Sequence, residues 1–163
     1  MGRASTKPNK NLFQLSREEL ELTREKASEV LQSITPDRIE KIENEKAVPY
    51  PDEILVMANG YKKPELCNYY CSHICEIGRK YVPEVKIKDL SRIVLEIIAS
   101  MNRMGAKNDR LIEIAADGGI ANEEYEDFEE IRKELGNISM AIEELRLWAE
   151  KMKAAGIIDK DEF

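Results

Sequence analysis

The chain has 163 residues, of which 42% are hydrophobic and 35% charged, which suits one sizeable domain or two small ones. No apolar run approaches the length of a membrane span, and the polar residues 1–11 lack the apolar stretch of a signal peptide. We therefore expect a cytoplasmic protein without membrane contact, whose three cysteines form no structural disulfides. Aromatic residues are few, at 6%, and apolar residues recur mostly every three or four positions, which predicts an all-α fold.

The net charge of −7 is unevenly distributed along the chain. Residues 1–63 hold 11 basic and 11 acidic side chains, whereas residues 64–163 hold 14 basic and 21 acidic ones. The acidity therefore does not exclude nucleic-acid binding by the first part. We expect four regions: a flexible basic tail (1–11), a DNA-binding domain (12–63), a cysteine-containing connector (64–88) and a helical dimerisation or interaction region (89–163). The tail is either a disordered terminus or an arm that touches phosphates or a minor groove.

Turn and capping residues divide the second region into four short helices. Thr23 can cap a helix over residues 24–31, and Pro36 suits a first helical position because its missing N–H has no helical partner there. Asp52 can cap the fourth helix, and Gly60 stands in the usual helix-ending position. The inward side chains expected on the second to fourth helices are Ala27, Leu31, Ile39, Ile42, Ile54, Leu55, Met57 and Ala58.

A specific set of residues marks the second and third helices. In chain order, the set is Leu22-Thr23, Ile39, Ile42-Glu43, Lys46 and Pro49. In this order it resembles the Xre family of lambda-repressor-like helix-turn-helix regulators, over about residues 12–61. Glu45 stands where that family often has glycine. The resemblance implies an N-terminal domain of four to five helices that inserts its third helix into the major groove of double-stranded DNA.

The same resemblance implies the DNA-binding residues. Arg24 opens the supporting helix and is expected at a phosphate or a base. Arg38 and Lys41 are the side chains able to hydrogen-bond guanine or phosphate. The full expected set is Arg24, Thr35, Pro36, Asp37, Arg38, Lys41 and Lys46. Residues 35–46 also carry four acidic side chains, which can accept hydrogen bonds from cytosine but are unfavourable near phosphates.

The connector contains the sequence Cys67-Asn-Tyr-Tyr-Cys71-Ser-His73-Ile-Cys75. In a helix the three sulfurs share one side and His73 points elsewhere, whereas in a loop all four side chains can converge on zinc. Three thiolates can also hold an iron–sulfur cluster. The remaining interpretation is ordinary packing of three small apolar side chains. No cofactor is required by any other feature of the sequence.

The region after residue 88 predicts a helical bundle or hairpin with a long last helix. One helix follows Asp89, a shorter one spans residues 108–116, and the last runs from about residue 122 to 155. Steps of three and four in the last helix form a heptad seam. Its members are Phe128, Ile131, Leu135, Ile138, Ile142, Leu145, Ala149 and Met152. The seam is expected to bury itself in a homodimer, in an intramolecular bundle, or in both.

Enzymatic chemistry has little support, because no serine or cysteine has a plausible base beside it and no glycine loop can cradle a phosphate. We expect a non-enzymatic, sequence-specific transcriptional regulator that binds DNA as a dimer; the sequence names no effector. One alternative is a protein-interaction adaptor or inhibitor with a structural helix-turn-helix and an acidic C-terminal surface. A third possibility is a metal- or redox-responsive sensor controlled by the cysteines.

Overall fold

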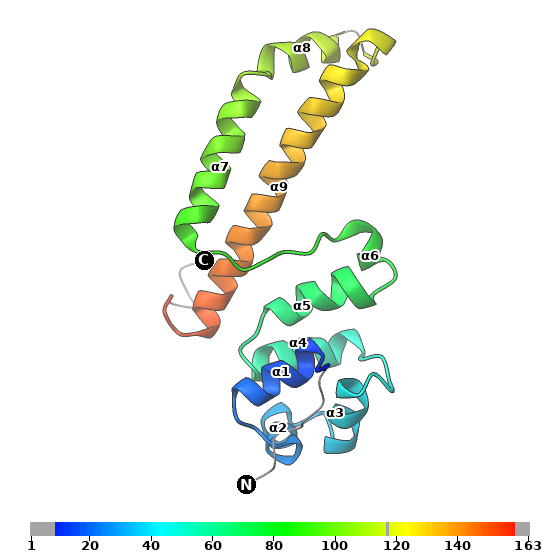
Figure 1. The fold of residues 1–163 in the computed structure, drawn as a ribbon, viewed down its shortest axis with the longest axis vertical. Coiled ribbons are helices and arrows are strands. Elements are labelled where there is room, and N and C mark those ends of the chain that lie inside the picture. The colour runs from blue at the N-terminus through cyan, green and yellow to red at the C-terminus, as the bar shows by residue number, and fades with distance from the viewer. Residues whose placement is uncertain (1–8, 117, 159–163) are drawn as a thin grey trace. The chain divides into compact units, whose positions relative to one another are not determined.

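A computed structural model describes residues 9–116 and 118–158 of the chain (Figure 1). Every regular element in this described part is helical, which confirms the predicted all-α class. The chain divides into two compact units. The first contains the residues up to 84 together with those from 149 onward, and the second is Val85–Trp148.

The first unit begins with four short helices. They are α1 (Leu12–Glu19), α2 (Arg24–Leu31), α3 (Pro36–Glu43) and α4 (Pro51–Gly60). A side chain outside each of the first three helices accepts a hydrogen bond from a backbone amide in the first turn: Asn11 from Gln14, Thr23 from Lys26 and Thr35 from Arg38. Such caps satisfy donors that the helix leaves unpaired. The expected cap at Thr23 and the expected first position of Pro36 are both present.

The ends of α4 differ from the sequence prediction. Tyr50 is the capping position and Asp52 lies inside the first turn, while Glu53 accepts a hydrogen bond from the Tyr50 backbone N–H at 2.7 Å. Gly60 is the last helical residue, and the left-handed conformation after the helix is taken by Lys62 instead. A Cβ atom on Gly60 would lie 2.5 Å from Cδ2 of Leu31, so a larger residue here would require the Leu31 side chain to shift.

One hydrophobic core holds these helices together. Its fully buried members are Phe13, Ala27, Leu31, Ile34, Ile39, Ile42, Ile54, Met57, Ala58, Tyr61 and Leu66. Leu55, expected in the core, is instead exposed, because Ile54 and Ala58, one helical turn apart, already occupy the inward side of α4. Leu66 extends the core into the cysteine segment.

The cysteine segment is helical and packs against that core instead of forming an open connector. It consists of α5 (Glu65–Tyr69), a single π-helical turn η1 (Tyr70–Ile74) and α6 (Gly78–Tyr81). Partly buried Cys67, Tyr69, Tyr70 and Ile74 cover the core from this side. These contacts make the segment part of the first unit.

The second unit is a helical hairpin, as predicted. It contains α7 (Leu90–Gly105), α8 (Asn108–Ala116), the short η2 (Asn122–Glu124) and most of α9 (Tyr125–Ala154). Figure 1 shows α7 and α9 running side by side in opposite directions. Gly136 lies within α9 without interrupting it. The left-handed Gly156 follows the end of α9 at Ala154, close to the end predicted at about residue 155.

Candidate nucleic-acid interface

The third helix is fastened to the unit through its inward side. Ile39 and Ile42 are buried in the core, and the carboxylate of Glu43 is buried beside them. The Arg17 guanidinium in α1 donates to both Glu43 oxygens, from Nε at 2.5 Å and from Nη2 at 3.0 Å. Arg24 in α2 donates to the same carboxylate at 2.9 Å. One buried anion therefore joins three helices.

The pKa of Arg17 reflects its contact with the Glu43 carboxylate. Burial by itself would lower the pKa of Arg17, but the hydrogen bonds and charge attraction from Glu43 outweigh burial and raise that pKa. The Arg17 Nη1 group also donates to the Leu22 carbonyl at 2.5 Å, in the turn before α2. The pair is thus fully hydrogen-bonded, which a buried ion pair requires to be favourable.

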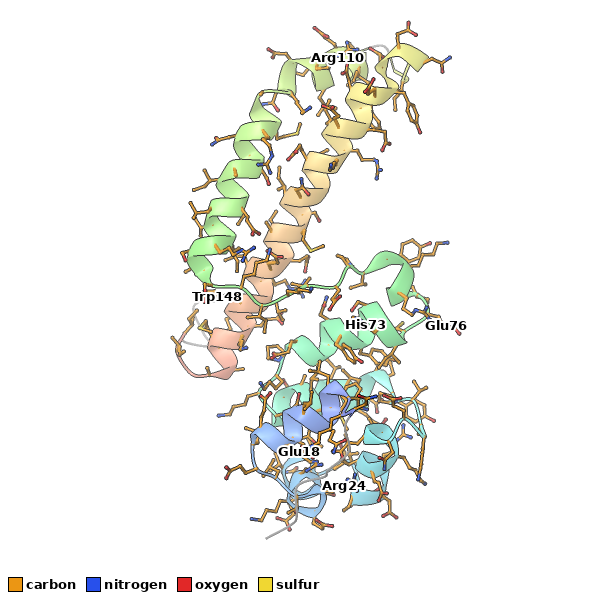
Figure 2. The ribbon with its side chains drawn as sticks, in the orientation of Figure 1. Glu18, Arg24, His73, Glu76, Arg110 and Trp148 are labelled. Atoms are coloured by element: carbon orange, nitrogen blue, oxygen red, sulfur yellow. The ribbon has the colours of Figure 1, made fainter. Side chains whose placement is uncertain are left out.

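The outward side of α3 presents four exposed side chains at and near its N-terminal end. They are Thr35, Asp37, Glu40 and Lys41, with Pro36 and Arg38 half-buried between them. Of the DNA-contact residues expected on this helix, Asp37 and Lys41 are exposed, whereas Pro36 and Arg38 are only partly exposed. Arg24, labelled in Figure 2, lies at the start of α2 and also approaches Glu40 at 3.5 Å. Its guanidinium is therefore engaged by two carboxylates.

The guanidinium of Arg38 is held by hydrogen bonds and a ring contact within the first unit. Its Nε and Nη2 atoms each donate to a Glu53 carboxylate oxygen at 2.7 Å, and Nη2 also reaches the Val48 carbonyl at 2.9 Å. The guanidinium lies over the ring of Tyr50, 5.0 Å from its centroid. These hydrogen bonds raise the pKa of Arg38 and lower that of Glu53. The sequence pattern did not identify Glu53 or Tyr50 as partners of Arg38, because the pairing spans the turn between α3 and α4.

Three lysines around α2 and α3 remain without such partners. Lys26, Lys41 and Lys46 are exposed, and within the described residues none of them forms an ion pair. Lys26, in the first turn of α2, was absent from the expected set of DNA contacts. Exposed ammonium groups without carboxylate partners are suited to phosphate contacts, because no internal ion pair has to break first.

The cysteine segment does not gather its candidate ligands. In residues 9–116 and 118–158, no group of three or more His, Cys, Asp or Glu side chains is arranged to hold a metal ion. Cys67, Cys71 and Cys75 are free thiols, and burial raises the pKa of Cys67. Cys75 Sγ accepts a hydrogen bond from the Gly78 N–H at 3.4 Å. His73 stacks on Tyr69 instead, with ring centroids 4.6 Å apart.

The structure splits the predicted dimerisation seam. Ile131 is fully buried within the hairpin, so it is not available to a second chain. Phe128, Ile138 and Leu145 are partly buried, whereas Leu135 and Ile142 are exposed. The last two positions of the seam, Ala149 and Met152, group with the first unit.

None of the helices in the described ranges combines the length and apolar character that a membrane span requires. The chain matches no protein-family model, and neither a curated protein nor a solved structure matches it.

Proposed function

We propose that this protein is a sequence-specific, non-enzymatic transcriptional regulator that binds double-stranded DNA as a homodimer, in the manner of Xre-type helix-turn-helix proteins. The observation that carries the proposal is the two-sided character of α3. Its inward side is fixed by Ile39, Ile42 and the buried Glu43 carboxylate. Its outward side is exposed and polar, so the helix is rigidly held with its recognition side accessible.

The size and chemistry of α3 suit a major groove. A helix with its side chains is about 10–12 Å across, and the groove is about 12 Å wide. Asp37 can accept a hydrogen bond from cytosine N4, Lys41 can donate to guanine, and Thr35 can do either. Pro36 offers only an apolar edge. The exposed lysines Lys26 and Lys46 then serve as phosphate anchors on either side of the recognition residues.

Arg38 has a different role in this proposal from the base contact that the sequence pattern predicts. Two nitrogen atoms of Arg38 donate to Glu53, so Arg38 stabilises the turn between α3 and α4. Its guanidinium is therefore not available to contact a base. Arg24 likewise supports α3 through Glu43. Base preference is therefore expected to depend on Asp37 and Lys41 more than on either arginine.

The test is selection of bound duplexes from a random-sequence pool at low salt. The affinity for the selected sequence is then measured as a function of salt concentration. An enriched motif with a twofold repeat is expected. Replacing both Lys26 and Lys46 with alanine should lower affinity and reduce the salt slope by about 0.9 for each lost phosphate contact. Lys133→Ala, which removes an exposed lysine from α9, is the matched control and should leave both quantities unchanged. Failure to enrich any motif would contradict the proposal.

A second function is favoured by a specific observation: both arginines near α3 are neutralised internally by carboxylates. Exposed Glu25, Glu29, Asp37 and Glu40 then leave this surface acidic in places. That charge suits an adaptor or inhibitor that meets a basic protein. Absence of a DNA motif, combined with salt-sensitive capture of a basic partner by the unaltered protein, would favour this second function.

A further inference from the structure

We infer that the second unit pairs with a second copy of itself through one apolar side of the α7–α9 hairpin, forming a four-helix assembly. We define the hairpin apolar face as Leu90, Val94, Ile98 and Met101 on α7 with Leu135 and Ile142 on α9. The inference deepens the homodimer part of the proposed function and rests on it for its role in DNA binding. The pairing itself stands on the geometry below.

The opposite side of the hairpin is polar and internally paired. A hollow of about 360 Å³ lies there, and both helices line it with polar or small residues that include Glu96, Ser100, Asn137 and Glu144. Lys88 spans the two helices by contacting Glu96 at 2.6 Å and Glu144 at 2.7 Å. This side of the hairpin therefore satisfies its own charges.

The apolar residues lie on the other side of each helix. At 100° per residue, Leu90, Val94, Ile98 and Met101 occupy an arc of about 80° on α7, roughly opposite the residues that line the hollow. Leu135 and Ile142 are likewise opposite the lining residues of α9. Because both lining sets border one hollow, both apolar sets must point to the same opposite side.

The ion pairs between the helices also align these residues lengthwise. Arg103 contacts Glu134 at 2.9 Å near one end of the hollow, and Lys88 contacts Glu144 near the other. In this antiparallel register, Leu135 lies level with Met101, and Ile142 lies level with Val94. The α7 and α9 residues of the hairpin apolar face therefore form one continuous surface, whose six side chains are each between 38% and 59% exposed. Monomers rarely expose a continuous apolar patch of this extent.

The absence of charge on the α7 part of this face indicates which partner covers it. Helix α7 has three charged residues, Arg92, Glu96 and Arg103, and all of them lie on its polar side. The α7 residues of the hairpin apolar face therefore form an uncharged stripe. A nucleic acid or a charged peptide would find no counter-charge on that stripe and would lose hydration without compensation. A second copy brings an identical uncharged stripe, and a twofold axis places each stripe on the other.

The dimensions also fit a second copy. Alongside the 16 residues of α7, the two helices form a side about 24 Å long and about 20 Å wide, roughly 500 Å². Two such sides bury about 1,000 Å² in total, which is the lower limit for a specific interface. Two hairpins packed in this way give a four-helix arrangement with a shared apolar interior.

The experiment is sedimentation equilibrium of the full chain from low to high micromolar concentration. The unaltered protein should have twice the 18.7 kDa chain mass. The double variant Ile98→Glu/Ile142→Glu should sediment as a monomer, with dimer affinity at least 100-fold weaker, because four carboxylates would be buried in an apolar interface. Both side chains are half-exposed, so circular dichroism should show unchanged helix content. Met101→Lys, a single change at the same surface, should weaken the dimer without risk to the hairpin fold.

The matched control is Val30→Glu/Leu55→Glu, which makes the same chemical change at two similarly exposed apolar residues of the first unit. It should leave the dimer intact. A monomeric unaltered protein, a dimer that survives in the folded Ile98→Glu/Ile142→Glu or Met101→Lys variants, or equal loss in the control would each overturn the inference. An intact dimer that selects no DNA motif would contradict DNA binding and leave the pairing surface standing.

Discussion

Arg17 and Glu43 join α1 to the last turn of α3 by two parallel hydrogen bonds of 2.5 and 3.0 Å. Both side chains are more than 90% buried. The position of α3 therefore depends on a charge pair as well as on Ile39 and Ile42 beneath it. A buried pair of this kind is costly to break, because the remaining charge has neither water nor partner.

Glu43→Ala should therefore destabilise the protein by about 3–5 kcal/mol, since it leaves the buried Arg17 guanidinium uncompensated. Glu40→Ala is the control: Glu40 lies one turn earlier on α3, is exposed, and approaches Arg24 only at 3.5 Å. Its loss should cost less than about 1 kcal/mol. Urea unfolding followed by circular dichroism measures both. Similar midpoints for the two variants would contradict the role assigned to the pair.

The Arg38–Glu53 pair predicts a specific acid sensitivity. Hydrogen bonds from Arg38 lower the pKa of Glu53 from its ordinary value of 4.5. A carboxylate with a lower pKa in the folded state stabilises that state above the ordinary pKa, and the contribution is lost as pH falls through the lowered value. Glu53→Gln cannot titrate, so its stability deficit relative to the unaltered protein should be largest at neutral pH and shrink below pH 4.5. A deficit that stays constant with pH would contradict this prediction.

The helical elements were predictable where local signals decide them. Thr23 and Pro36 mark the starts of α2 and α3, and both boundaries agree with the structure. The pairing of Arg38 with Glu53 was not predictable, because the two side chains are 15 positions apart and their contact depends on how α3 and α4 pack. In α9, the heptad pattern located an apolar side but did not determine how much of it α7 covers.

The path of the cysteine segment could not be predicted from its spacing either. Cysteines at every fourth position fit a helix, a metal loop or packing equally well. The deciding residues are Leu66, which enters the core, and Gly78, which permits a close backbone approach. Neither carries a local sequence signal of its own.

Glu45 predicts a stabilising substitution. It has a φ of 57°, in the left-handed region that side chains other than glycine adopt at a cost, and it is exposed. Glu45→Gly should raise the free energy of unfolding by about 0.5–1 kcal/mol. Asn44→Gly is the control: Asn44 has a φ of −93°, and glycine there adds freedom to the unfolded chain and removes the side-chain hydrogen bond to Glu40. Thermal melts should move in opposite directions for the two variants, and a lower melting temperature for Glu45→Gly would contradict the argument.

Gly78 predicts the opposite effect in the cysteine segment. A Cβ atom at this position would lie 2.1 Å from the carbonyl oxygen of Cys71 and 2.9 Å from its Cα. Both are backbone atoms of the π-helical turn, so relief requires α6 or η1 to move, and the 3.4 Å hydrogen bond from the Gly78 N–H to Cys75 would be lost. Gly78→Ala should therefore destabilise the protein by about 1–3 kcal/mol.

The same variant has a second, local readout. Burial raises the pKa of the Cys67 thiol and slows its reaction with thiol reagents, so loosening of the segment should speed the labelling of Cys67. Gly105→Ala is the control, because a Cβ atom there meets nothing within 4 Å at the end of α7. It should leave the labelling rate unchanged and not lower stability. If Gly78→Ala matches the unaltered protein in both urea midpoint and labelling rate, α6 does not hold the cysteine segment against the core.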